Sequence, residues 1–305
     1  MKISRGTWAL LGVVLVWSLP SIFQHYLARH YDVWTQNFYR YLIGFISILP
    51  LALWELKKGA RMDGKSALAC LWPALPNAIH QVAQTTAVVV MLPGLYMVLG
   101  RFSVILAAIM ALIFFPDERY IIRHWKFQVG VGLGLAGMAG LCGWIPFYAS
   151  GRGEQMDDVL IGLLMTAAFS WALYGVMVKR FVIHINAGLA FAAISFFTTL
   201  IQFPLMMWFG HPELPLQTSW QVNAILVFSA IICIGVGHTL YLWAIAEFGV
   251  AVSQNTLFLC PIGTMAVSYI FFGETITLKQ GILAGLLLIG AALALNVPRK
   301  EKSPT

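Results

Sequence analysis

The stretch FYRYLIGFISILPLALW, residues 38–54, decides the fold class of this chain, because it is apolar over most of the length that a membrane-spanning helix needs. Such a helix takes about 20 mostly apolar residues. Arg40 is the one charged residue in this stretch, and Arg101 is the one charged residue in GLYMVLGRFSVILAAIMALIFF, residues 94–115. A charged side chain in hydrocarbon is costly, so each arginine indicates a function or a partner inside the membrane.

Composition extends this conclusion to the whole chain. Hydrophobic residues make up 60% of the 305 residues and charged residues 10%, whereas soluble domains carry roughly 25% charged residues. The sequence therefore predicts an all-α membrane protein. Ten apolar segments are long enough to span a bilayer: 7–28, 34–55, 66–91, 94–115, 127–149, 159–180, 186–209, 220–246, 250–272 and 278–297.

Positive charge is distributed unevenly over the connections between these segments. With the N-terminus in the cytoplasm, 14 of the 19 lysines and arginines lie on the cytoplasmic side, and only Arg29, Arg152 and Lys279 lie on the other. Cytoplasmic loops of membrane proteins carry such an excess. We therefore expect ten spans with both termini in the cytoplasm, and we attribute the net charge of +7 to the membrane.

Signatures of several other functions are absent from the sequence. It contains no CxxC, no HExxH and no carboxylate-rich motif for magnesium diphosphate, and its four cysteines fall at unrelated spacings inside apolar segments. It also lacks the clustered base-reading or stacking elements of a nucleic-acid surface. We expect no catalytic residue, no metal site, no cofactor and no nucleic-acid partner.

The two halves of the chain resemble each other in order. VWSLPSIF around Trp17 matches SWALYGVM around Trp171, and FFPDE at 114–118 matches FFGE at 271–274. Five helices in each half is an odd number, so the second half must enter the membrane upside down relative to the first. Inverted repeats of this kind are typical of secondary transporters, with the substrate site near the midplane. We expect one repeat over residues 7–149 and the other over 159–297.

Glycine pairs and glutamates of the two halves are expected to form contacts between helices. The pairs Gly130/Gly134 and Gly281/Gly285 have the small-xxx-small spacing that lets helix backbones approach closely in lipid. Glu118 and Glu274 are expected to cap helices or anchor loops. Glu247 is expected to pair with Lys179 or another cation on the same side.

Together these motifs resemble the drug/metabolite transporter superfamily, specifically its EamA-type ten-helix exporters. The resemblance rests on Trp17 and Trp171, on the arginine in FYRYLIGF, and on FFPDE and FFGE, and it covers about residues 7–297. The junction from residue 116 to 127 departs from it, because it is longer than its counterpart in the second half. The resemblance implies export of small, often amino-acid-like metabolites across a bacterial inner membrane, and it names no single substrate.

The two intramembrane arginines are the first candidates for substrate binding. Arg40 and Arg101 each lie about seven residues from the predicted outer end of a span, which at 1.5 Å per residue is a depth of about 10 Å. A guanidinium group matches a carboxylate or phosphate with two parallel hydrogen bonds. Arg40 matches a position that the family shares, so bonds to backbone carbonyls, or an outward-pointing side chain, remain alternatives for it.

Polar residues of the third, eighth and ninth segments form a second group of candidates, because amides that face lipid are costly. Bonds between helices are the alternative explanation for this polar pattern. Two histidines could also carry protons near neutral pH, although a membrane histidine is often a hydrogen-bonding core residue. With the two mid-helix tryptophans, the predicted substrate-binding residues besides the arginines are Asn77, His80, Gln81, Gln84, Trp17, Trp171, His238, Tyr241 and Asn255.

The sequence therefore favours a secondary active or facilitative transporter that works by alternating access. We expect it to move, most readily outward, a small metabolite with an anionic group, such as an amino acid or small organic acid. The partners expected are the bilayer and the substrate, with a coupling proton as an alternative to downhill transport, in a monomer or weak homodimer. The alternatives are an exporter of cationic, drug-like or sugar substrates, a membrane-embedded enzyme, and a non-transporting structural or signalling protein.

Overall fold

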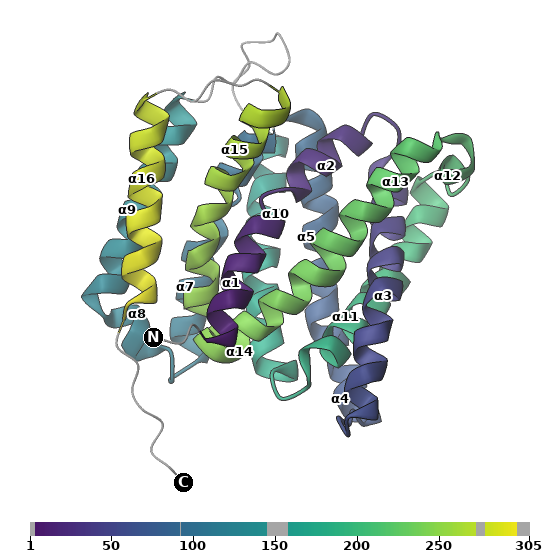
Figure 1. The fold of residues 1–305 in the computed structure, drawn as a ribbon, viewed down its shortest axis with the longest axis horizontal. Helices are drawn as coiled ribbons and strands as arrows, with labels where there is room; N and C mark the ends of the chain where they lie inside the picture. Colours follow the sequence, from purple (N-terminus) through teal and green to yellow (C-terminus); the bar gives the residue numbers. More distant parts are fainter. Residues whose placement is uncertain (1–3, 92, 145–157, 273–277, 298–305) are drawn as a thin grey trace.

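The computed structural model describes residues 4–91, 93–144, 158–272 and 278–297, and every element in these ranges is a helix. Figure 1 shows them as one bundle. The elements are α1 (Arg5–Val16), α2 (Pro20–Leu27), α3 (Val33–Lys57), α4 (Gly64–Ala69), α5 (Leu71–Val90), α6 (Pro93–Leu99), α7 (Phe102–Phe114), α8 (Arg119–Arg123), α9 (Trp125–Trp144), α10 (Asp158–Met177), the π-helix η1 (Val178–Val182), α11 (Ala187–Phe209), α12 (Leu214–Gln217), α13 (Trp220–Ser229), the π-helix η2 (Ala230–Val236), α14 (Gly237–Thr256), the 3₁₀ helix η3 (Leu257–Leu259), α15 (Cys260–Phe272) and α16 (Leu278–Leu295).

Five helical segments of the described chain are long and apolar enough to cross a membrane: Arg5–Leu27, Val33–Lys57, Asp158–Val182, Ala187–Phe209 and Trp220–Thr264. Phe102–Phe114 is a shorter apolar helix. The prediction of an all-helical membrane protein is therefore confirmed, while ten spans remain a prediction. The end of the predicted segment 127–149, beyond Trp144, lies outside the described residues.

Large apolar side chains cover the outside of the bundle. Leu15, Trp208 and Trp220 are each more than 70% exposed. Soluble monomers rarely expose contiguous apolar surface on this scale, whereas lipid-facing helices must. Buried polar residues are correspondingly frequent inside, where they can reach partners on other helices.

The chain enters and leaves the bundle at one end. The start of α1 and the end of α16 both lie at the bottom of Figure 1; we call this end the base and the opposite end the top. Helix α3 therefore runs from the top to the base, and α5 runs back to the top. The position of the base relative to the cytoplasm is part of the proposal below.

Three glutamates at the base each cap a helix of the other half of the chain. Glu118 accepts the N–H groups of Val250 and Ala251, both at 2.8 Å. Glu55 accepts the N–H of Leu189 at 2.9 Å, and Glu247 accepts the N–H of Gly6 at 2.6 Å. A carboxylate is stabilising at a helix N-terminus, where N–H groups have no partner within the helix. These bonds hold the two halves together at the base.

Gly249 makes the cap at Glu118 possible. Its φ of 81° and ψ of 176° break α14 into two helices, so that the second one starts at Val250. A Cβ at this position would lie 2.7 Å from the Glu118 carboxyl carbon. The glycine therefore provides both the backbone conformation and the room for the carboxylate.

Helices α9 and α16, the last of each half, contact each other through their backbones. A Cβ built on Gly130 would lie 2.5 Å from the carbonyl oxygen of Gly290, and one built on Gly290 would lie 2.5 Å from that of Gly130. The close approach predicted for Gly130 is confirmed. The one predicted for Gly281 and Gly285 is wrong for the described residues, because none of them lies within 4 Å of a Cβ at either position.

Candidate functional site

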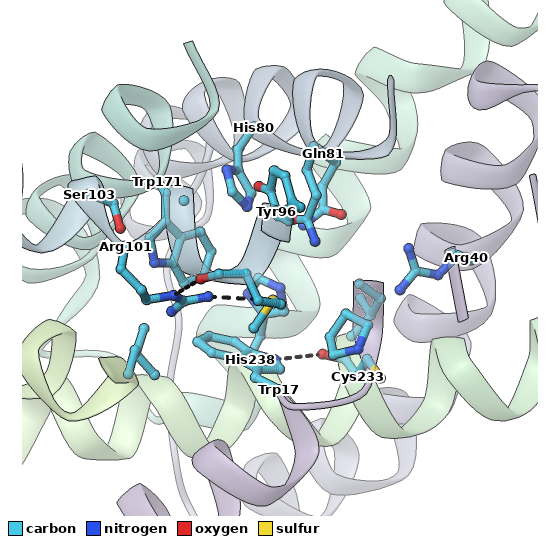
Figure 2. A pocket seen from close by; sticks show the side chains of 16 residues that line it. Trp17, Arg40, His80, Gln81, Tyr96, Arg101, Ser103, Trp171, Cys233 and His238 are labelled. Carbon is cyan, nitrogen blue, oxygen red and sulfur yellow. Dashed lines mark hydrogen bonds between the residues drawn. The ribbon is translucent and has the colours of Figure 1, made fainter. Parts of the chain in front are cut away.

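A cavity lies in the upper half of the bundle, between helices from both halves of the chain. Its empty space is about 550 Å³, part of which is open to solvent. Figure 2 shows its side chains converging from α3, α5, α10 and α14. The lining residues are Trp17, Pro20, Arg40, His80, Gln81, Gln84, Tyr96, Met97, Gly100, Arg101, Ser103, Trp171, Cys233, Ile234, His238 and Leu257.

Two of the predicted spans are interrupted beside this cavity. Helix α1 ends at Val16 and α2 begins at Pro20, where proline suits the first helical turn because its missing N–H would have no partner there. The predicted span 94–115 is interrupted at Gly100 and Arg101, between the end of α6 and the start of α7. Discontinuous membrane helices bring unpaired backbone groups to transporter binding sites. Both interruptions line the cavity.

Arg40 is buried at one side of the cavity without a partner. Its side chain is 1% exposed, and none of its three guanidinium nitrogens has a hydrogen-bond partner among the described residues. A buried charge without a partner is strongly unfavourable. The bonds to backbone carbonyls considered as its alternative role are absent from the described structure.

Arg101 lies across the cavity from Arg40 in Figure 2. Its Nε donates to the Met97 carbonyl at 3.0 Å, one turn back at the end of α6, and Nη2 contacts the Met97 sulfur at 3.7 Å. The side chain is half-buried. The break in the helix frees the carbonyl that orients this guanidinium, whose remaining N–H groups are available to a ligand.

Two tryptophans form the wall between the arginines. The ring centroids of Trp17 and Trp171 are 5.0 Å apart in an edge-to-face arrangement. Trp17 Nε1 donates to the Cys233 carbonyl at 3.0 Å. That carbonyl lies within the π-helix η2, a form of helix that is common at functional sites. The bond fixes the Trp17 ring against the second half of the chain.

His238 is held by two tyrosines in a chain of hydrogen bonds. The Tyr41 hydroxyl donates to Asn77 Oδ1 at 3.0 Å and so accepts from His238 Nε2 at 3.4 Å. The other ring nitrogen, Nδ1, accepts from the Tyr174 hydroxyl at 3.1 Å. We assign the tautomer from these partners. Both nitrogens are therefore used, and the ring contributes its face and edge to the cavity.

His80 and Gln84 are each held by a hydrogen bond to another helix. His80 Nδ1 donates to the Ala167 carbonyl at 2.8 Å, so the neutral ring carries its lone pair on Nε2. Gln84 Nε2 donates to Gln24 Oε1 at 2.8 Å. The ring of His80 lies 4.8 Å from that of Trp171, between centroids. The side chains of His80 and Gln84 also interact with each other, so both are held at the cavity lining.

The cavity brings together most of the residues that the sequence singled out. Trp17, Arg40, His80, Gln81, Gln84, Arg101, Trp171 and His238 line it. Three others do not. Asn77 bonds to Tyr41 and Thr198, Tyr241 packs on Trp171 at 5.4 Å between centroids, and Asn255 is fully buried without a partner among the described residues.

Some lining residues were not predicted. Met97, Ser103, Cys233, Ile234 and Leu257 line the cavity but are apolar or small, and nothing in their residue types indicates a binding site. Gly100, immediately before Arg101, was the available signal for the break in that helix. The described residues contain no group of three His, Cys, Asp or Glu side chains that could hold a metal ion.

A second cavity lies towards the base, with about 530 Å³ of empty space, part of which is open to solvent. Arg5 and Trp243 line it, and the Arg5 guanidinium carbon lies 4.2 Å from the centroid of the Trp243 ring. Along α10, Trp171 lines the upper cavity and Tyr174 follows one turn below, and Val178 at the start of η1 lines the lower cavity. Together with Tyr241 on α14, Tyr174 forms a buried aromatic layer between the two cavities.

The fold, its apolar surface and its polar cavity between two halves define a helical membrane protein of the transporter class. The chain belongs to the EamA-like transporter family, whose sequence profile matches residues 4–143 and again 159–296. The resemblance to this family is therefore confirmed, and the family consists of transporters rather than enzymes.

Two curated relatives carry the same general description. An uncharacterized transporter of Haemophilus influenzae is 26% identical over 211 residues, which cover 67% of this chain and 66% of that protein, just under two thirds of its length. The uncharacterized transporter YvbV of Bacillus subtilis is 24% identical over 274 residues, 87% of this chain and 82% of that protein. Neither description names a substrate.

A solved structure has the same fold, and its description reads only "Crystal structure of protein". Its TM-score is 0.70 at 17% sequence identity, and the match covers 96% of this chain and 97% of that one. At this identity the likeness concerns the fold alone.

Proposed function

We propose that this protein moves a small metabolite with an anionic group, an amino acid or small organic acid, across the bacterial inner membrane by alternating access. It would be a secondary active or facilitative transporter, and the direction that the family favours is export. The base of the bundle would face the cytoplasm, and the complete chain would have ten spans.

The unpartnered guanidinium group of Arg40 carries the proposal of an anionic substrate. It lines a cavity that also receives Arg101, and no aspartate or glutamate among the described residues lines that cavity. Cation binding would need acidic residues here, so cationic and drug-like substrates are disfavoured. The aromatic walls can hold the apolar part of an organic anion.

Alternating access is supported by the way the two halves meet. The three glutamate caps hold them together at the base, and the aromatic layer separates the upper cavity from the lower one. This arrangement suits a state that is closed at the base. Opening the base would break these caps while the top closes around the substrate.

A coupling proton, if transport uses one, is assigned to His80 rather than His238. Both ring nitrogens of His238 bond to tyrosines, whereas His80 bonds to the Ala167 carbonyl and to Gln84, whose amide oxygen can accept from a protonated ring. In vesicles with a pH gradient, His80→Asn should abolish gradient-driven transport but reduce exchange only in part. Gradient-driven transport that persists in this variant would contradict the assignment.

The function is tested by transport in proteoliposomes without nucleotide. Purified protein would be assayed for counterflow of labelled amino acids, organic acids, sugars and quaternary amines, beside Arg101→Gln and the control Arg29→Gln. Arg29 is exposed near the top of the bundle, so its variant changes net charge equally without touching the cavity. We expect counterflow of a carboxylate-bearing solute that is lost only in Arg101→Gln. Movement of sugars or amines alone, unchanged in that variant, would overturn the proposal.

A further inference from the structure

The upper cavity contains two positive charges and no described negative one. Arg40 and Arg101 both line it, and neither forms an ion pair with a described carboxylate. The described glutamates at the base are used differently, because Glu55, Glu118 and Glu247 accept N–H groups from helix starts. The charge of the cavity is therefore not balanced by any described residue that lines it.

The two guanidinium groups lie on opposite sides of the cavity in Figure 2, with Trp17 and His238 between them. Arg40 offers all three nitrogens, none of which has a partner among the described residues, and Arg101 is oriented by its bond to the Met97 carbonyl. An anionic group held by one arginine leaves the other without a counter-charge. In a low-dielectric interior, a second anionic group that pairs with this remaining charge strengthens the complex strongly, because the charge is unpaired in the free protein.

We propose that the substrate of this cavity is a dianion, a molecule with two anionic groups joined by a short spacer, and that it bridges Arg40 and Arg101. This inference rests on the proposed function and narrows it from any anionic solute to dicarboxylates and acids of similar charge. The spacer lies along the Trp17 and Trp171 rings. Binding then neutralises both guanidinium groups at once.

The test compares acids that differ only in one charge. Isothermal titration calorimetry on the detergent-purified full chain would measure α,ω-dicarboxylates of three to six carbons, each beside its own monoamide, such as succinate beside succinamate. The amide keeps the length and shape but removes one negative charge. We expect the best dicarboxylate to bind about a hundredfold more tightly than its monoamide.

Variants locate the effect at the two arginines. Arg40→Gln and Arg101→Gln should each reduce that ratio to within about threefold of unity, because only one counter-charge remains. Arg29→Gln should keep it. Arg101 is half-buried at a helix break, so its variant provides the test by itself if Arg40→Gln does not accumulate as folded protein.

Three results would overturn the proposal that the substrate is a dianion. One is equal binding of dicarboxylates and monoamides at every length. Another is a ratio that falls in Arg101→Gln but stays in a folded Arg40→Gln. In both cases counterflow of monoanions would leave the proposed function standing. If no acid of either kind binds or is transported, the proposed function fails together with this inference.

Discussion

The ammonium group of Lys179 lies 2.8 Å from a carboxylate oxygen of Glu118, and this ion pair joins the two halves of the chain at the base. The same carboxylate accepts the N–H groups of Val250 and Ala251. Glu118 is only 3% exposed, whereas Asp117, which also pairs with Lys179, is 68% exposed. The two neighbouring acids thus offer a matched comparison of a buried and an exposed partner.

Replacing Glu118 should loosen the base. In Glu118→Gln, one helix-capping bond and the buried one of the two charges that pair with Lys179 are lost, which should cost about 1–3 kcal/mol. Asp117→Asn should cost less than about 1 kcal/mol, because exposed pairs contribute little. Thermal unfolding in detergent measures both.

Opening of the base can be followed separately from stability. A cysteine placed at Ala246, which lines the lower cavity, should react severalfold faster with a water-soluble maleimide in the Glu118→Gln background than in the Asp117→Asn background. Equal labelling rates would show that the Glu118 cap does not hold the base closed.

Gly249 should tolerate no side chain. Gly249→Ala places a Cβ against the Glu118 carboxylate and forces a backbone region that is almost exclusive to glycine, at a cost of about 1–3 kcal/mol for the backbone alone. Gly59 also has a positive φ, of 92°, but nothing lies within 4 Å of its Cβ position. Gly59→Ala should therefore lower the melting temperature by less. A larger effect at Gly59 would contradict the role assigned to the Glu118 contact.

Gly130 should be sensitive and its neighbour Gly132 should not. A Cβ at Gly130 meets the Gly290 carbonyl at 2.5 Å, whereas one at Gly132 has nothing within 4 Å. Gly130→Ala should lower the melting temperature. Gly132→Ala should leave it unchanged or raise it, since alanine favours a helix over glycine by about 0.5–1 kcal/mol. Similar melting temperatures for the two variants would refute the backbone contact between α9 and α16.

The hydroxyl groups of Tyr174 and Tyr241 should contribute differently. Tyr174 donates to His238, and its loss in Tyr174→Phe leaves a buried acceptor without a partner, at a cost of about 1–3 kcal/mol. The Tyr241 hydroxyl has no partner among the described residues. Tyr241→Phe should be neutral or stabilising by thermal unfolding. Destabilisation by Tyr241→Phe would mean that an unseen partner, such as a water molecule, satisfies that hydroxyl.

Much of this architecture was predictable because it depends on patterns that cover many residues. Apolar length and repeated motifs identified the helical membrane fold and the family. Arg40 and Arg101 were predicted to face one cavity because they lie at equal depth, and the structure places both at its lining. The helix-capping role of Glu118 also followed from its place at a junction, whereas Glu274 lies outside the described residues.

The remaining errors concern which face of a helix meets which neighbour. Asn77 and Gln81 are one turn apart, yet Asn77 bonds to Tyr41 while Gln81 lines the cavity. Gly281 and Gly285 have the spacing of a contact face, but Gly290, farther along α16, makes the contact. Lys179, one suggested partner of Glu247, pairs with Asp117 and Glu118. A single sequence does not contain the rotation of each helix about its axis, which tertiary packing determines.

The backbone contact between Gly130 and Gly290 has a consequence for how such a molecule could move. Helices packed this closely cannot slide past each other without a collision between main-chain atoms. Since α9 belongs to the first half and α16 to the second, this backbone contact joins the two halves rigidly at one side of the bundle. Alternating access would then be a rotation of the two halves about an axis near this contact, and the helices farthest from the contact would move most.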